Sequence, residues 1–105
     1  MAVRSFTLSE NAQRDLDSIL EWTAEHFGER QAERYEGALT ETFKILANDP
    51  ERGLERSDLG KGLRSIHMRR PGRHFVLYRE NNDVLLIDRI LHDSMELSRH
   101  FPSND

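Results

Sequence analysis

The amino-acid sequence predicts an α+β fold: an N-terminal strand, a two-helix antiparallel hairpin packed on a mainly antiparallel four-stranded sheet, and a short C-terminal helix. Apolar residues recur at steps of three and four between residues 12 and 46, as on one face of a helix. Three short apolar segments follow between residues 63 and 91, and their connections are too short for parallel crossovers. The 105 residues have the length of one domain, so we assign residues 1–105 to a single domain.

The N-terminal part begins with a strand and continues into a helix. Residues 3–8 alternate β-branched, polar and aromatic side chains, as a half-buried strand does. Ser9 can cap the helix that follows, and Glu10 in its first turn favours the helix dipole. Gly28 can take the left-handed conformation that ends such a helix. The residues predicted for its inner face are Ala12, Leu16, Ile19, Leu20, Thr23 and Phe27.

A second helix follows Gly28 and stops before Pro50. Because almost nothing connects the two helices, they must fold back as an antiparallel hairpin. Trp22 lies beside the apolar face, and we interpret it as the flank of the core, with a partner contact as the alternative. The predicted inner face of the second helix is Ala32, Tyr35, Leu39, Phe43 and Leu46. The solvated face of the hairpin is predicted at Glu21, Glu25, Glu29, Glu33 and Glu36.

The C-terminal half reads as a loop and three strands. Residues 51–62 mix Gly, Pro and charge, as a surface loop does, and the strands are predicted at 63–68, 74–79 and 84–91. Pro71-Gly72 and Asn81-Asn82-Asp83 supply the turns. Residues 84–87 are all apolar, so we expect the last strand to lie inside the sheet with both faces covered. Asp93 is predicted to cap a terminal helix, with Glu96 as its capping-box partner.

Composition and charge limit the function. There is no cysteine, no apolar run of about 20 residues and no signal-peptide pattern, so we expect a soluble cytoplasmic protein. Residues 51–79 hold 8 basic and 3 acidic side chains (+5), between flanks of 5 and 10 (−5) and of 2 and 6 (−4). An acidic chain of net charge −4 is repelled by polyphosphates, so direct nucleic-acid binding is not expected. His92 and His100 lack a third clustered ligand, and we expect neither metal nor cofactor.

Several segments, in order and spacing, carry a resemblance that runs from about Phe6 to His100. They are Asp15-Leu16 before Trp22, residues 31–35, residues 46–50, residues 62–64, residues 74–79, residues 90–97 and Arg99-His100. Together they resemble the ParE-type toxins of the RelE/ParE superfamily. The resemblance implies a toxin of a bacterial type II toxin–antitoxin pair, which inhibits DNA gyrase and is neutralised by a ParD-like antitoxin that folds around it.

The alternative is a RelE-like endoribonuclease that cuts mRNA on the ribosome. RNA cleavage needs a group that activates the ribose 2′-hydroxyl and cations that stabilise charge on phosphorus. The RelE branch has a tyrosine near its C-terminus, where this chain offers only Phe101 as an aromatic residue. Tyr78 lies within a strand and is expected to be packed. A cationic surface that leaves catalysis open could form from Arg64, Arg73, Arg79, Arg89, His74 and His92. Without the tyrosine we predict no catalytic residue, and an inactive member kept as a binding module is the third hypothesis.

Two sets of residues are the candidate contact sites. The target-binding candidates are Arg89, His92, Met95, Glu96, Arg99 and His100. The antitoxin-binding candidates are Trp22, Tyr35, Leu39, Arg64 and His74. Each set has a simpler structural reading: His74 can be a cross-strand contact, and Met95 and Leu97 can cover an exposed sheet face. We expect residues 89–100 to carry toxicity more than they carry the fold.

Overall fold

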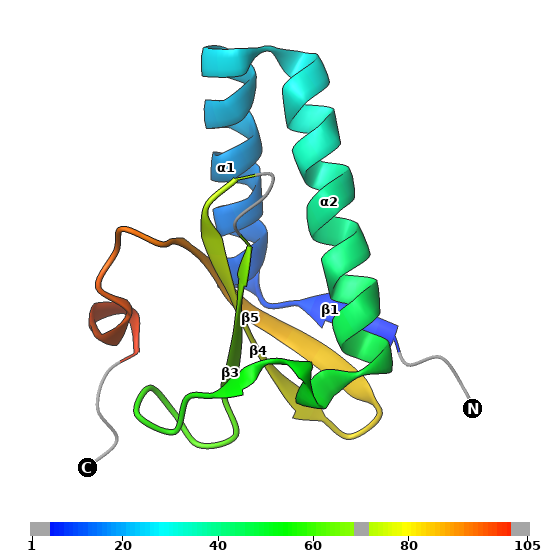
Figure 1. Cartoon of the computed structure of the whole chain (residues 1–105), viewed down its shortest axis with the longest axis vertical. Helices are drawn as coiled ribbons and strands as arrows, with labels where there is room; N and C mark the ends of the chain where they lie inside the picture. Colours follow the sequence, from blue (N-terminus) through cyan, green and yellow to red (C-terminus); the bar gives the residue numbers. More distant parts are fainter. Residues whose placement is uncertain (1–4, 69–71, 102–105) are drawn as a thin grey trace.

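The computed structural model describes residues 5–68 and 72–101 and confirms the α+β fold class (Figure 1). Its elements are β1 (Ser5–Leu8), α1 (Glu10–Phe27), α2 (Glu29–Asn48), β2 (Leu54–Glu55), β3 (Arg64–Met68), β4 (His74–Asn81) and β5 (Val84–His92). Single 3₁₀ turns lie at Pro50–Arg52 and Leu97–His100. None of the helices in the described ranges is long and apolar enough to cross a membrane.

The sheet has five strands rather than the four expected, in the order β1-β5-β4-β3-β2. The added strand, β2, is two residues long and lies inside the segment predicted as a loop, where Leu54 pairs with Ser65. β1 runs parallel to β5, and the other pairs are antiparallel. β5 therefore lies inside the sheet between β1 and β4, as its apolar run predicted.

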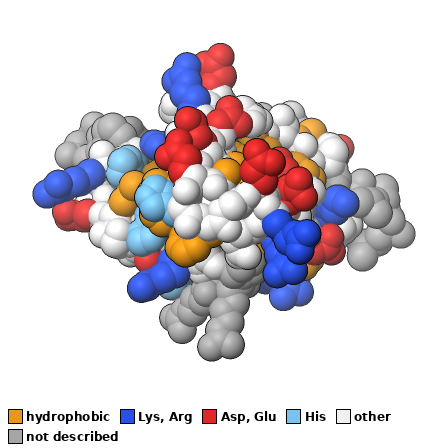
Figure 2. Space-filling model, turned by 90° about the horizontal axis from the view of Figure 1, so that it is seen from above, with side chains coloured by type: hydrophobic (Ala, Val, Ile, Leu, Met, Phe, Trp, Pro, Cys, Tyr) orange, Lys and Arg blue, Asp and Glu red, His pale blue; other side chains and the backbone are white. Residues whose placement is uncertain are grey.

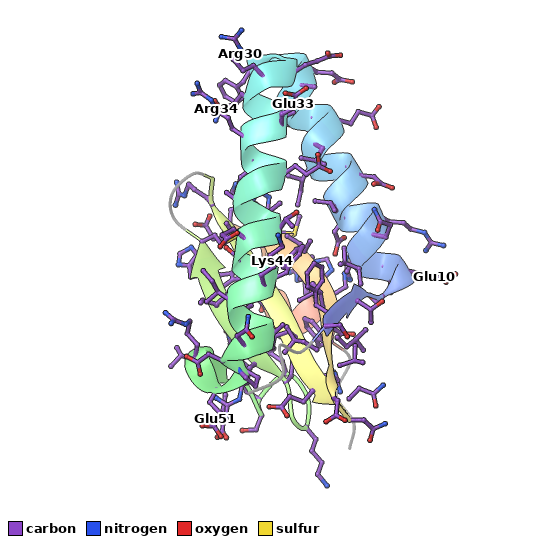
Figure 3. All side chains as sticks on the ribbon, turned by 90° about the vertical axis from the view of Figure 1, so that its right-hand side faces the viewer. Glu10, Arg30, Glu33, Arg34, Lys44 and Glu51 are labelled. Carbon is purple, nitrogen blue, oxygen red and sulfur yellow. The ribbon has the colours of Figure 1, made fainter. Side chains whose placement is uncertain are left out.

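The helical hairpin begins and turns at the predicted residues. Ser9 caps α1, because its Oγ accepts the backbone N–H of Ala12 at 3.0 Å. Gly28 has a φ of +93° and separates α1 from α2 without a longer loop. The hairpin covers one face of the sheet and extends beyond its edge (Figure 1). At this free end Arg30, Glu33 and Arg34 point away from the sheet (Figure 3).

The main core lies between the hairpin and the sheet. Its largest fully buried side chains from the helices are Leu39, Phe43 and Leu46. The strands contribute Met68, Val76, Tyr78, Leu85, Ile87 and Ile90. Two residues of α1 were predicted wrongly: Phe27 is 66% exposed and Trp22 is 53% exposed. Both lie in the last turns of α1, beyond the part that the sheet covers, so helical periodicity continues there without a core to fill.

A second, smaller cluster covers the other face of the sheet. It contains Leu59, Leu63, Leu77, Leu91 and Leu97. Leu77 and Leu91 follow core residues directly in β4 and β5, and successive strand residues point to opposite faces. Leu97 belongs to the terminal segment, so this segment contributes to the fold by covering apolar surface.

The terminal helix and its predicted cap differ from expectation. The helix is a single 3₁₀ turn, and Glu96, not Asp93, precedes it. The Asp93 carboxylate instead accepts hydrogen bonds from His67 Nε2 at 2.9 Å and Arg73 Nε at 3.1 Å. The capping-box prediction is therefore wrong, because tertiary partners on β3 and beside β4 hold the carboxylate that the local pattern assigned to a cap.

Tyr78 fixes the loop that follows α2. It is fully buried, as predicted, and its hydroxyl donates to the carbonyl of Pro50 and accepts the N–H of Gly53, both at 2.8 Å. Burial raises the pKa of Tyr78 and keeps its hydroxyl protonated. The hydroxyl is therefore a structural hydrogen-bonding group and has no access to a reactant.

Candidate functional site

A groove of about 810 Å³ opens where the hairpin extends beyond the sheet. α1 forms one wall, α2 and the turn before β4 form another, and the end of β5 with the terminal segment completes it. The lining residues are Ser18, Ile19, Trp22, Thr23, Phe27, Gln31, Tyr35, Gly72, Arg73, His74, His92 and Met95. Figure 2 shows histidines grouped beside hydrophobic side chains on one side of the helix tips.

Large apolar side chains are exposed in this groove. Trp22, Phe27 and Met95 (45% exposed) are three of the five exposed large hydrophobic residues within the described ranges. The Trp22 ring meets that of Phe27 edge-on at 5.7 Å and stacks on His26 at 4.2 Å. Exposed apolar side chains that gather in one depression are typical of a protein-binding surface.

The floor of the groove holds a neutral tyrosine–histidine pair. The Tyr35 hydroxyl and His74 Nδ1 are 2.6 Å apart. Burial, and then the charge of the neighbouring His92, lowers the pKa of His74 to about 4. Burial, and then the charge of Asp93, raises the pKa of Tyr35 to about 12. At neutral pH both side chains are therefore uncharged, and the hydrogen bond joins a neutral hydroxyl to a neutral imidazole.

The rim beside the floor carries positive charge. Arg73 is 73% exposed, and only its Nε is engaged, with Asp93, among the contacts of the described residues. Hydrogen bonds from His67 and then Arg73 hold the pKa of Asp93 below its usual value. His92 pairs with His74 across β4 and β5, and its Nδ1 accepts the N–H of Ser94 at 3.1 Å. None of the lining residues within the described ranges is acidic.

The antitoxin-binding candidates divide into three places. Trp22, Tyr35 and His74 come together in the groove. Leu39 is fully buried in the main core. Arg64 lies at the opposite end of β3, where its Nη1 donates to the carbonyl of Gly53 at 2.8 Å. His74 also makes the cross-strand contact that the simpler reading predicts.

The target-binding candidates are also dispersed. His92 and Met95 line the groove. Arg89 lies on β5 and forms an ion pair with Asp15 of α1 at 2.7 Å. Glu96 and Arg99 form an exposed pair at 3.0 Å on the terminal turn, which ends at His100. The groove therefore joins members of both predicted sets.

Several groove residues were missed in the sequence. Ser18 and Gln31 are polar, and Arg73 was considered only as one cation of a possible catalytic surface and of the basic segment. The step of four from Ser18 to Trp22, followed by Phe27, places these residues near one another on α1. This second row of residues on α1 could be found from the sequence. That the end of β5 lies beside it could not. Within residues 5–68 and 72–101, no cluster of three or more potential ligand side chains could hold a metal ion.

A family model described as "ParE toxin of type II toxin-antitoxin system, parDE" matches residues 6–97. The chain belongs to the ParE toxin family. It is 33% identical over 98 residues to Toxin ParE1 of Caulobacter vibrioides, which covers 93% of this chain and 98% of that toxin. It is 34% identical to Toxin ParE3 of the same organism over 84 residues (80% and 81% of the two chains), and 28% identical to Toxin ParE1 of Mycobacterium tuberculosis over 96 residues (90% and 95%).

The fold agrees with a solved structure of the same kind. A chain of a chromosomal ParDE toxin–antitoxin system from P. aeruginosa superposes with a TM-score of 0.72 at 22% identity. The match covers 86% of this chain and 96% of that one. The family resemblance and the α+β prediction are both confirmed, and the chain is a ParE toxin of a type II toxin–antitoxin system.

Proposed function

We propose that this toxin inhibits DNA gyrase by binding to it and that a ParD-like antitoxin neutralises it. The match to the ParE family over residues 6–97 carries the proposal. The ParDE name of the solved relative pairs toxin with antitoxin, which supports the same arrangement here. We further propose residues 89–100 as the gyrase contact and the groove as the antitoxin contact.

The electrostatics of the groove favour binding over catalysis. A general acid or base works best with a pKa near the operating pH. The pKa of His74 is about 4 and that of Tyr35 about 12, so neither exchanges a proton readily at pH 7. Asp93 is held by His67 and Arg73, and the lowered pKa of its carboxylate makes it a weak base. These groups organise a surface; they are not poised for general acid–base chemistry.

The position of the groove suggests how neutralisation works. His92 and Met95 belong to the proposed gyrase contact and also line the groove. An antitoxin segment in the groove covers both side chains. Gyrase and antitoxin then compete for the same two residues, and the antitoxin needs no conformational change in the toxin to block the target.

Gyrase assays with purified toxin test the proposal. Free toxin should reduce the supercoiling of relaxed plasmid or trap cleaved DNA, and it should leave ribosome-bound mRNA intact. Addition of the ParD-like antitoxin should restore supercoiling. Codon-specific cuts in mRNA with undisturbed supercoiling would show the RelE-like ribonuclease instead. Normal supercoiling and intact mRNA at saturating toxin would favour the inactive binding module.

A further inference from the structure

The groove has a polarity that defines what it binds. One end is apolar, with Trp22 and Phe27 exposed on the last turns of α1. The other end is positively charged at Arg73, with His92 next to it at the end of β5. Between these ends lies the neutral Tyr35–His74 pair. A partner must therefore present apolar side chains toward the hairpin tip and a negative group toward the sheet.

The length of the groove fits a short helix. The lining residues of α1 run from Ser18 to Phe27, which corresponds to about 14 Å at a rise of about 1.5 Å per residue. This length accommodates between two and three helical turns, which present apolar anchors at steps of three and four. α1 supplies apolar contacts at steps of three and five through Ile19, Trp22 and Phe27.

Arg73 is the group that receives the negative charge. Its Nε donates to Asp93, and this contact holds the guanidinium at the rim. Among the contacts of the described residues, its two Nη groups have no acceptor. Arginine presents a planar fork of donors that matches a carboxylate. Asp93 therefore positions Arg73 while leaving most of its donors for a partner.

We propose that the groove binds an amphipathic antitoxin helix whose apolar stripe ends in a carboxylate side chain, which Arg73 and His92 receive. This proposal rests on the proposed antitoxin pairing and adds the chemistry of the segment that docks. The apolar stripe supplies most of the binding free energy, and the carboxylate sets the register of the helix because it is accepted at one end only.

Trp22 supplies the measurement, because it is the single tryptophan of the chain and lines the groove. Three synthetic helical peptides of about 12 residues, free of tryptophan, would share one leucine stripe. They would differ only in the residue at one end of the stripe: Glu, Gln or Lys. Each is titrated into the full-length toxin, and the blue shift of Trp22 emission and its shielding from acrylamide give the Kd.

We expect the Glu peptide to bind about three to ten times more tightly than the Gln peptide, and the Lys peptide most weakly. Arg73→Gln should abolish the preference for Glu over Gln, and Arg73→Glu should reverse it in favour of Lys. Arg52→Gln is the matched control, because Arg52 is also exposed and paired with an aspartate, Asp49, but does not line the groove. It should bind all three peptides as the wild type does.

Equal affinity for the three peptides would contradict the recognition of a carboxylate by Arg73 and His92. If no peptide shifts the emission of Trp22, the groove does not bind a helix. Circular dichroism of each variant shows whether it is folded; if Arg73→Gln unfolds, the affinity ranking of the wild type alone decides. These titrations contain no gyrase. A toxin that fails to inhibit gyrase therefore contradicts the proposed function and leaves the peptide result standing, and the reverse also holds.

Discussion

Asp15 on α1 forms a two-point ion pair with Arg89 on β5, with its carboxylate oxygens 2.7 Å from Nε and 2.9 Å from Nη2. The same carboxylate accepts the backbone N–H of Ile90 at 2.9 Å. The parallel partner of β5 ends at Leu8, which pairs with Ile87. Asp15 therefore replaces the missing strand at this edge and joins the hairpin to the sheet.

Replacement of Asp15 with alanine should destabilise the fold by about 2 kcal/mol, because it leaves the N–H of Ile90 and the guanidinium of Arg89 without their partner. Urea unfolding at pH 7 measures the change. Asp17→Ala is the control, since Asp17 is exposed and accepts only from Gln13 within the described contacts; it should change stability by less than about 0.5 kcal/mol. Equal effects of the two substitutions would contradict the edge role of Asp15.

Arg89 was predicted as a target contact, and its ion pair with Asp15 offers a structural role instead. A double-mutant cycle with Asp15→Ala and Arg89→Ala separates the two. If Arg89 is structural, the losses of unfolding free energy in the two single variants should not add up to the loss in the double variant. The difference, the coupling energy, should be about 1 kcal/mol or more. A coupling near zero, together with loss of toxicity in Arg89→Ala alone, would assign Arg89 to the target surface.

The sequence was sufficient where structure depends on near neighbours. Ser9 as a cap and Gly28 as the turn between helices follow from residues within one helical turn, and both were predicted. Asp93 was assigned to a cap by the same local logic, but His67 and Arg73 hold it from distant positions. A local sequence pattern does not show which distant residues, such as His67 and Arg73, will lie beside a given side chain in the fold.

The candidate site was only partly predictable for the same reason. Trp22 was recognised as apolar, but helical periodicity does not show where the sheet beneath a helix ends. The groove exists because α1 continues beyond that edge. Leu39 shows the opposite error: a residue on the apolar face was offered as a partner contact, and the sheet covers it completely. The sequence gives side-chain chemistry, whereas tertiary packing decides which faces stay open.

The buried imidazole of His74 should make stability depend on pH. Its pKa is about 4 in the folded protein against 6.5 for a free histidine, so the unfolded chain takes up the proton first. The stabilisation is therefore complete above pH 6.5 and is lost as the pH falls from 6.5 toward 4. Between pH 7 and 5 wild-type stability should fall by about 1 kcal/mol more than that of His74→Gln, a modest figure because the ring is only half-buried.

Urea unfolding of both proteins at pH 8, 7, 6 and 5 checks this difference in slope. Val76→Ala is a suitable control, because Val76 is buried on the same face of β4 and does not titrate. It should lower stability by a similar amount at every pH. Parallel pH profiles for the wild type and His74→Gln would show that the pKa of His74 is the same in the folded and unfolded protein.

Replacing each of two glycines with alanine should change the stability of the protein in opposite directions. Gly37 is exposed within α2, and a Cβ there would meet no atom within 4 Å, so Gly37→Ala should stabilise the protein by about 0.5–1 kcal/mol. A Cβ on Gly53 would overlap the Tyr78 hydroxyl and lie 2.8 Å from the carbonyl oxygen of Ser65. Gly53→Ala should therefore cost about 2 kcal/mol or more. Thermal unfolding of both variants measures the changes; a neutral Gly53→Ala would show that the loop can move away from Tyr78.

The proposed gyrase contact is best tested by substitution, because Leu97 packs with Leu91 on the second face of the sheet. Truncation after His92 would uncover that cluster, and Leu97→Ala alone should cost about 2 kcal/mol. Arg99 and His100 lie on the same turn, and Arg99 is 80% exposed. Replacing both with alanine should abolish growth inhibition while changing stability by less than about 0.5 kcal/mol, because an exposed ion pair contributes little.

Arg52→Ala is the control for this double substitution. Arg52 forms an exposed pair with Asp49 three residues away, as Arg99 does with Glu96, but it follows α2 rather than β5. It should keep full growth inhibition. The Arg99 and His100 variant should still bind the ParD-like antitoxin, since neither residue lines the groove. A double variant that remains toxic would exclude this turn as the gyrase contact. If the double variant loses both antitoxin binding and toxicity, the groove and the terminal turn form one continuous surface.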